Sequence, residues 1–180
     1  MTKTKTTYLY RHELEIIPEV NPRIPCEFIQ LPAVQLDRLT AIRSLSPQKL
    51  LQFQRRFQRG DTCFVADYQG QAVHYSWLQV DGVHPIQPAG RSRAVAPAEA
   101  WIFDCRTVES VRGKNIYPFV LTQILRTLRS QAFACAWIYT SHDNIASQRG
   151  IAKAEFQITH RLHCLEFAGL VIPLPPIPVH

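Results

Sequence analysis

The segment from Arg112 to Tyr117 joins two basic side chains to a turn that opens a predicted helix. The first backbone amides of a helix have no partner within the helix, and the helix dipole adds partial positive charge there. Such a turn is suited to bind phosphate or pyrophosphate, and Arg112 and Lys114 would add full charges. Taken alone, such residues at a helix start usually form no more than a solvated turn. The segment is not a Walker A loop or a dinucleotide fingerprint, because Gly113 is its only glycine.

A second group of polar residues lies downstream, at Asn144 and Ser147. Asparagine is a favoured helix N-cap, because its side-chain oxygen accepts a hydrogen bond from an amide of the first turn. Capping alone accounts for Asn144. The position of this group after the basic turn is the feature that we use below.

A third group, His160, His163 and Cys164, contains residue types that bind zinc. In a strand, His160 and Cys164 share one face and His163 points to the other. No fourth ligand is nearby, so the three are poorly placed for a tetrahedral site. We therefore expect no metal.

Hydrophobic spacing around these groups predicts a chain of mixed strands and helices. Helices are expected around 36–42, from the N-cap Ser46 and the following Pro47 to Gly60, after Tyr117, and over 144–154. The third has a clear apolar stripe from Val120 to Leu128. Segment 81–98 is polar and proline-bearing, which predicts a long surface loop or an irregular hairpin. The expected strands cover 8–17, 62–68, 71–80, 101–108, 134–140, 156–167 and 170–174.

Composition places the chain among ordinary globular proteins. It has 180 residues, 46% hydrophobic and 19% charged, which argues against disorder, collagen and coiled coil. We predict one domain over 1–180. The net charge of +6 favours an anionic partner, and nucleic acid, a membrane surface and a phosphorylated cofactor all fit. No secretory signal or membrane-spanning run is visible, and the five scattered cysteines suit reduced thiols, so we expect a cytoplasmic protein.

The basic turn and the downstream cap, in this order, resemble the GNAT superfamily of acyl-coenzyme A dependent N-acyltransferases. The pyrophosphate loop of that family reads Arg/Gln-x-x-Gly-x-Gly/Ala, and Arg112 matches its first position. Asn144, Ser147, Lys153 and Phe156 then follow in the family's order. The resemblance covers residues 45–167 and leaves 168–180 as a terminal strand and a Pro-rich tail.

The chain departs from the family pattern at several positions. Asn115 stands at the key glycine and Tyr117 at the second Gly/Ala. An alternative register, from Ser110 through Gly113, recovers one glycine but puts the apolar stripe of the helix out of phase. Glu155 replaces a glycine before Phe156, and Ile151 stands where many members keep a tyrosine general acid.

The resemblance implies an α+β fold and an acyl-coenzyme A co-substrate. The sheet would be mixed and mostly antiparallel, with about six to seven strands flanked by helices, and splayed between the family's fourth and fifth strands. Acetyl-coenzyme A or a longer acyl-coenzyme A would bind without a metal. The implied cofactor-binding residues are Thr107, Val108, Arg112, Gly113, Lys114, Asn115, Ile116, Tyr117, Asn144 and Ser147, and the basic residues Arg126 and Arg129 could approach the adenosine phosphate.

The resemblance also implies direct attack of an amine on the thioester, assisted by a general base. The candidates for proton transfer are Asp104, Tyr139 and His142, with Glu99 as a weaker one. Burial would raise the pKa of Asp104, whereas the alternative is a simple ion pair with an arginine. Tyr139 could be a core aromatic, and His142 lies in a polar turn. Segment 81–98 and the first two helices would shape a pocket for an amine on a small molecule, a sugar or a peptide.

Two other functions stay open at this point. A GNAT-fold protein that has lost catalysis could sense a ligand or bind a protein, which the departures at Asn115, Tyr117 and Ile151 motivate. An unrelated basic domain could bind nucleic acid, but the chain has no RNP, helix-turn-helix or zinc-finger pattern, so we expect no nucleic-acid partner and no membrane. The arginines at 55, 56 and 59 suggest a solvated helix face. The tail 173–178 could cover its own core or join two subunits in a homodimer.

Overall fold

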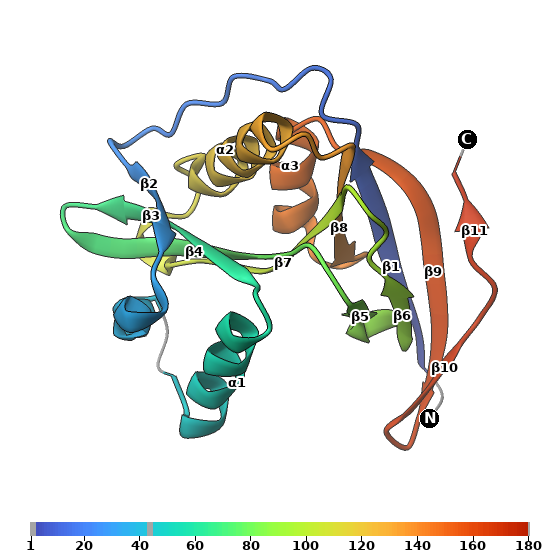
Figure 1. The fold of residues 1–180 in the computed structure, drawn as a ribbon. Helices are drawn as coiled ribbons and strands as arrows, with labels where there is room; N and C mark the ends of the chain where they lie inside the picture. Colours follow the sequence, from blue (N-terminus) through green and yellow to red (C-terminus); the bar gives the residue numbers. More distant parts are fainter. Residues whose placement is uncertain (1–2, 43–44, 180) are drawn as a thin grey trace.

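A sheet of nine strands runs through the protein (Figure 1). The structure is a computed structural model that describes residues 3–42 and 45–179. The strand order is β10-β9-β1-β8-β7-β4-β3-β2, with β11 paired to β9, while β5 and β6 form a separate hairpin. The strands are β1 (Lys3–His12), β2 (Glu27–Leu31), β3 (Thr62–Tyr68), β4 (Gln71–Gln79), β5 (Val83–Ile86), β6 (Arg91–Ala94), β7 (Glu99–Thr107), β8 (Cys135–Ser141), β9 (Gln157–Phe167), β10 (Leu170–Pro173) and β11 (Ile177–Pro178).

All neighbouring strands are antiparallel except β7 and β8, which are parallel. These two strands pair only from Glu99↔Cys135 to Trp101↔Trp137. Beyond Trp101 they separate, so the predicted mixed sheet with its central splay is confirmed. The predicted number of strands was too low, because the short edge strand β2 and the two-residue β11 show little alternation of hydrophobic and polar residues.

Three α-helices and three 3-10 segments connect the strands. They are η1 (Ala33–Ala41), α1 (Pro47–Gln58), η2 (Gln87–Ala89), η3 (Glu109–Val111), α2 (Ile116–Ser130) and α3 (Ile145–Lys153). The predicted cap of α1 is confirmed, because the hydroxyl of Ser46 accepts a hydrogen bond from the Lys49 amide at 3.2 Å. Asn144 caps α3 through the Ser147 amide at 3.1 Å. The first expected helix is instead a kinked 3-10 segment with a non-helical residue, Gln35.

The helices divide between the two faces of the sheet (Figure 1). α2 and α3 cover one face, where the predicted stripe from Val120 to Leu128 is fully buried. On the other face, η1 and α1 pack on β3 and β4 around Phe53 and Trp77. The β5–β6 hairpin and η2 lie on β7, β8, β1 and β9 around Trp101 and Trp137.

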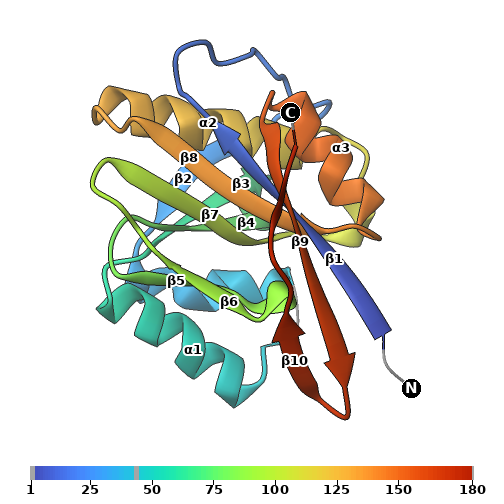
Figure 2. The ribbon, with the colours of Figure 1, turned by 90° about the vertical axis from the view of Figure 1, so that its right-hand side faces the viewer.

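The N-terminal strand and the C-terminal tail complete one end of the sheet (Figure 2). β1 ends at His12, five residues before the predicted end, and lies between β8 and β9. The C-terminal tail lies along the sheet of its own chain, since Ile177 pairs with Arg161 in β9. The last residue of the predicted tail, 180, lies outside the described part of the chain.

Within residues 3–42 and 45–179, no group of three His, Cys, Asp or Glu residues is placed to hold a metal ion. In the same part of the chain, no helix has the length and apolar character needed to cross a bilayer.

Candidate functional site

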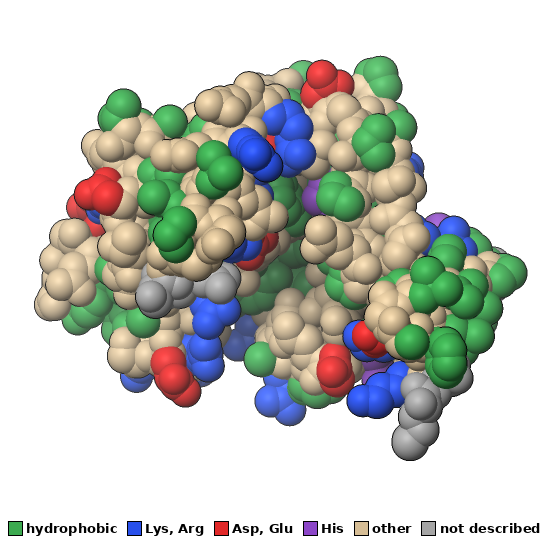
Figure 3. All heavy atoms as spheres, turned by 90° about the horizontal axis from the view of Figure 1, so that it is seen from below, with side chains coloured by type: hydrophobic (Ala, Val, Ile, Leu, Met, Phe, Trp, Pro, Cys, Tyr) green, Lys and Arg blue, Asp and Glu red, His purple; other side chains and the backbone are tan. Residues whose placement is uncertain are grey.

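Two cavities lie on opposite faces of the sheet, next to the place where β7 and β8 separate. The first, the α2–α3 cavity, has a volume of about 600 Å³ and is bounded by β7 and the N-terminal ends of α2 and α3. The second, the α1 cavity, has a volume of about 500 Å³ and lies between α1 and the β5–β6 hairpin. In Figure 3 the molecular face that carries α1 is hollowed near its centre, and Lys and Arg side chains lie on part of the rim of the hollow.

The α2–α3 cavity is strongly basic. Among the described residues, no Asp or Glu lines it, and the lining includes four cationic residues: Arg106, Arg112, Arg149 and Lys153. Arg112 contacts the Thr107 carbonyl at 3.4 Å and the Glu109 carboxylate at 3.8 Å. An excess of positive charge in a concave site favours an anionic ligand.

The turn before α2 presents unpaired amides to this cavity. Asn115 has a left-handed backbone (φ 59°), which asparagine tolerates, and its side-chain oxygen accepts a hydrogen bond from Lys153 Nζ at 2.7 Å. Among the described residues, no hydrogen-bond acceptor contacts the amides of Gly113, Asn115, Ile116 and Tyr117. These amides and the dipole of α2 give the turn the geometry of an anion site.

The Tyr117 ring lies against α3, in the wall of the cavity. A Cβ atom at Gly150 would stand only 2.4 Å from Tyr117 Cδ1, so the ring depends on this glycine for its place. Its hydroxyl is 3.4 Å from Ser147 Oγ, and its ring centroid is 5.6 Å from that of His74. Burial raises the pKa of Tyr117 well above its ordinary value, so the phenol is neutral.

His74, which sequence reasoning missed, joins β4 and β7 at the base of the same cavity. Its Nδ1 is 2.7 Å from Thr107 Oγ1 and its Nε2 is 2.8 Å from Ser76 Oγ. Burial lowers its pKa to about 3, so the ring is neutral. Because both nitrogens are occupied, His74 holds the strands together and fixes the Thr107 side chain.

Eight of the ten residues expected to bind a cofactor line this one cavity: Thr107, Arg112, Gly113, Asn115, Ile116, Tyr117, Asn144 and Ser147. Val108 does not, because its amide faces β4 and donates to the Val73 carbonyl at 2.9 Å. Lys114 also lies outside the lining, and its side chain is exposed.

The expected role of the two later arginines of α2 is not supported by their position. Arg126 and Arg129 contact the carbonyls of Pro18 and Glu15, each at 3.3 Å, away from the cavity. Arg106 and Arg149 take their place in the lining. An arginine on a strand next to a predicted phosphate turn was the signal that could have identified Arg106.

Asp104 lies in the α1 cavity and is held by two cations. One carboxylate oxygen is 2.6 Å from Arg56 Nη1 and 3.0 Å from Lys49 Nζ, and the other is 3.4 Å from the Tyr75 hydroxyl. The backbone of Asp104 is left-handed (φ 45°), which breaks the regular pairing of β7. Burial pushes the pKa of Asp104 upward, but Arg56 and Lys49 outweigh this and lower it overall. The expectation of a raised pKa was wrong, and the alternative of an arginine ion pair is the observed one.

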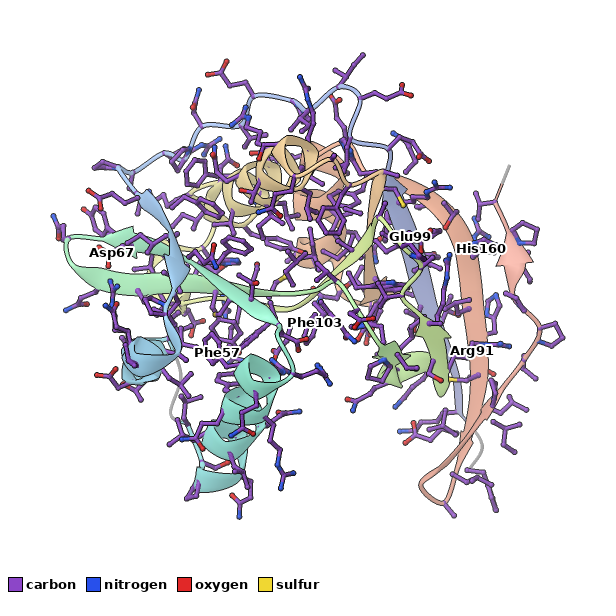
Figure 4. The ribbon with its side chains drawn as sticks, in the orientation of Figure 1. Phe57, Asp67, Arg91, Glu99, Phe103 and His160 are labelled. Atoms are coloured by element: carbon purple, nitrogen blue, oxygen red, sulfur yellow. The ribbon has the colours of Figure 1, made fainter. Side chains whose placement is uncertain are left out.

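Arg56 is buried, which corrects the interpretation of its helix face as solvated. Its guanidinium lies about 5 Å from the ring centres of Phe53, Trp77 and Phe103. Figure 4 shows Phe103 beneath β7, between α1 and the β5–β6 hairpin. A cation held among three aromatic rings has few alternative positions, so Arg56 fixes the carboxylate of Asp104.

The other predicted catalytic residues differ in their placement. Tyr139 lines the α1 cavity and donates a hydrogen bond to the Pro85 carbonyl at 3.3 Å, and burial raises its pKa to about 12. His142 is exposed, lies outside both cavities, and contacts the Tyr8 hydroxyl at 2.6 Å through Nδ1. Glu99 is paired with Arg93 at 3.3 Å and lines neither cavity.

The two cavities approach each other along β7. Phe103 and Asp104 line the α1 cavity, and Cys105, Arg106 and Thr107 line the α2–α3 cavity. Here β8 no longer pairs with β7, so no backbone ladder closes the space between them. Groups bound from the two faces could therefore meet beside β7.

The fold matches solved acetyltransferase structures. A GNAT-family acetyltransferase from Colwellia psychrerythraea aligns at 17% identity and a TM-score of 0.64, over 97% of this chain and 57% of that one. The GCN5-related glucosamine N-acetyltransferase region of a fungal multi-domain GH3 β-N-acetylglucosaminidase aligns at 12% identity and 0.66, over 93% and 21%. An N-acetyltransferase from Staphylococcus aureus Mu50 aligns at 14% identity and 0.55, over 74% and 84%.

These similarities establish that the chain has the GNAT fold. Comparison with models of known protein families and with curated protein sequences finds no match. The chain spans 57% of the Colwellia chain and 50% of a GCN5-related N-acetyltransferase from Sphaerobacter thermophilus. Sequence identities below one fifth support the fold alone, so the substrate has to be inferred from the two cavities.

Proposed function

We propose that this GNAT-fold protein is an N-acyltransferase that moves an acetyl or longer acyl group from acyl-coenzyme A to an amine. The donor would occupy the α2–α3 cavity and the acceptor the α1 cavity. The observation that carries the proposal is the pair of cavities lined by neighbouring residues of β7 at its open side, the first of them basic and lined by unpaired amides.

The residues of the α2–α3 cavity fit the phosphates of coenzyme A. The free amides of Gly113, Asn115, Ile116 and Tyr117 would bind pyrophosphate oxygens. Arg112 and Arg149 would support them. Thr107, whose carbonyl and side chain are fixed by Arg112 and His74, would orient the pantetheine arm. The donor supplies an electrophilic thioester carbonyl, and the protein's own part is to bind and orient it beside β7.

The residues of the α1 cavity would position the amine and control charge around it. Because its pKa is lowered, Asp104 is a poor proton acceptor near neutral pH. We assign it to holding Lys49 and Arg56 in place. Tyr139 stays protonated and keeps the hairpin carbonyl of Pro85 in the wall. The proton released by the attacking amine would pass to water, and His142 has no part in this proposal.

A turnover assay tests this function. The protein is incubated with acetyl-coenzyme A and a panel of amino acids, amino sugars and polyamines, and free coenzyme A and acetylated product are measured by mass spectrometry. We expect one amine class to be acetylated. Arg112→Ala should raise the KM for acetyl-coenzyme A by about tenfold, the effect of losing one charge-assisted contact. Arg126→Ala, on the same helix but outside the cavity, is the matched control. Absence of product with every amine would favour a fold that senses ligands without catalysis.

A further inference from the structure

The α1 cavity carries more positive charge than its own carboxylates neutralise. Four cations line it, Lys49, Arg55, Arg56 and Arg59, against the single carboxylate of Asp104. Arg59 is also paired with Asp61, which lies outside the lining. Even when Asp61 is counted, the described residues leave an excess of two positive charges over carboxylates. Arg55 forms no ion pair with any described residue.

The cations share one face of α1, which is why they meet in the cavity. Lys49, Gln52, Arg56 and Arg59 recur at three- and four-residue intervals, and this face lines the cavity. Two of the four cations are largely buried, since the side chain of Arg56 is 10% exposed and that of Lys49 is 21% exposed. Both use the same oxygen of Asp104. Two partly desolvated cations on one carboxylate leave a net charge that a bound anion would stabilise.

His84 adds a second, independent feature to the same cavity. It lines the cavity, is 1% exposed, and its Nε2 has no hydrogen-bond partner among the described residues. The ring lies flat against Trp101, with centroids 4.7 Å apart, and edge-on to Phe103 at 5.0 Å. A fixed, buried nitrogen without a partner calls for a ligand atom that completes its hydrogen bond.

The neighbours of His84 fix which hydrogen bond it can make. Gln79 Nε2 donates to the carbonyls of Asp81 at 2.7 Å and Val83 at 3.3 Å, so the other amide atom of Gln79 is an acceptor. This acceptor, Oε1, is 2.8 Å from His84 Nδ1, which therefore carries the hydrogen. Burial, followed by the charges of Arg59 and Arg56, lowers the pKa of His84 to about 4. The ring is neutral, and Nε2 is a bare acceptor.

We propose that the α1 cavity binds a ligand that combines a phosphate or carboxylate group with an N–H donor, the anion contacting the α1 cations and the donor contacting His84 Nε2. Only one part of this inference rests on the proposed function, namely that the N–H group contacting His84 belongs to the amine that receives the acyl group. In the transfer, the neutral amine nitrogen forms the new bond to the acyl carbon and the carbon–sulfur bond breaks. The nitrogen then loses one proton through water, and the leaving thiolate takes up one. His84 is a substrate-contacting residue that orients the amine.

Anion binding is tested without reference to turnover. Methyl phosphate is titrated into the wild-type protein, Arg55→Glu and Arg112→Ala, and binding is followed by NMR shifts of arginine side chains. We expect binding that Arg55→Glu weakens at least about tenfold and that Arg112→Ala leaves in place. Binding lost only in Arg112→Ala would assign the anion to the α2–α3 cavity and overturn the proposal, as would no binding at all.

The substrate class is tested by matched acceptors. Linear aminoalkyl phosphates, amino acids with a terminal amine, and amino alcohols of the same chain lengths are compared as acceptors of the acetyl group. We expect kcat/KM for both anionic series to exceed that of the amino alcohols by about tenfold or more, and we expect Arg55→Glu to bring the ratio between the anionic series and the amino alcohols close to one. The ratio between phosphates and carboxylates identifies the anion. Equal use of amino alcohols would overturn the inference.

The contact with His84 has its own pair of variants. His84→Phe keeps a ring of similar volume without the acceptor, and His84→Gln restores an amide oxygen near the position of Nε2. We expect the first to raise the KM for the amine by about tenfold and the second to recover part of it, with the KM for acetyl-coenzyme A unchanged in both. Equal effects of the two variants on both substrates would reduce His84 to a packing residue. Methyl phosphate binding without acylation of any amine would remove the proposed function and leave the anion site.

Discussion

At the scale of single residues, ion pairs organise the α1 cavity. Asp104 is the carboxylate on which Lys49 and Arg56 converge, and its left-handed backbone turns it away from the regular pairing of β7. The aromatic rings around Arg56 hold one side of the cluster. Removing the carboxylate would leave two cations close together with no acid between them.

Asp104→Asn should therefore destabilise the protein by about 3 kcal/mol at neutral pH, the lower end of the range for breaking a buried pair. Because its pKa is lowered in the folded state, the contribution of Asp104 is complete above its ordinary pKa of 3.8. It is lost as the pH falls through the lower folded-state value. Urea unfolding of wild type and variant should thus converge in strong acid. Asp37→Asn is the control, because Asp37 is exposed and has no ion pair among the described residues. An equal loss in both variants would refute the role.

The buried histidines give a prediction about protonation. The pKa values of about 3 for His74 and about 4 for His84 keep both rings neutral, whereas an unfolded histidine takes up a proton below about pH 6.5. Both groups therefore lower stability as the pH falls from that value towards 4. Histidine NMR spectra should show two rings that do not titrate between about pH 8 and 5. His84 should carry its hydrogen on Nδ1, and a hydrogen on Nε2 would contradict the bare acceptor.

At the scale of elements, the contact of α2 with α3 shapes the basic cavity. Tyr117 in the first turn of α2 reaches across to Gly150 in α3, and Lys153 in α3 reaches back to Asn115. These two contacts fix the turn whose amides face the cavity. The N-terminal ends of both helices are therefore coupled.

Gly150→Ala tests this coupling through the sign of the change in the free energy of unfolding. In an unconstrained helix the change would add up to about 1 kcal/mol of stability, because alanine is the better helix former. Here the new Cβ would overlap the Tyr117 ring, so we expect a loss of about 1 to 3 kcal/mol in thermal or urea unfolding. The double variant Gly150→Ala with Tyr117→Leu should recover most of this loss. A stabilised single variant would show that the ring is free to move away.

The same scale shows what sequence reasoning could reach. α1, α2 and α3 were predicted because caps such as Ser46 and Asn144 and the apolar stripe of α2 are local signals. The place of β1 between β8 and β9 was not, since its partners lie more than a hundred residues away in the chain. His84 and Arg56 were missed for the same reason. Each looks ordinary locally and acquires its role when the hairpin and α1 face each other.

At the scale of the molecule, the splayed sheet joins two basic cavities. α2 and α3 build one on the first face, and α1 with the β5–β6 hairpin builds the other on the second face. The parallel pairing of β7 and β8 ends at Trp101 and Trp137, and beyond it neighbouring residues of β7, Asp104 and Cys105, line one cavity each. In the proposed transfer, the positive charge of one cavity would bind the phosphorylated acyl donor, and that of the other would bind an anionic acceptor.

The most direct test of this account is calorimetric titration of the protein with acetyl-coenzyme A and desulfo-coenzyme A. We predict micromolar binding of both, weakened about tenfold by Arg112→Ala and by Arg149→Ala and unchanged by Arg126→Ala and Arg55→Glu. The first two variants remove cations of the α2–α3 cavity, and the last two change cations elsewhere on the protein, so the comparison locates the bound coenzyme A. Absence of binding, or equal weakening by all four variants, would contradict the placement of the acyl donor and with it the proposed transfer.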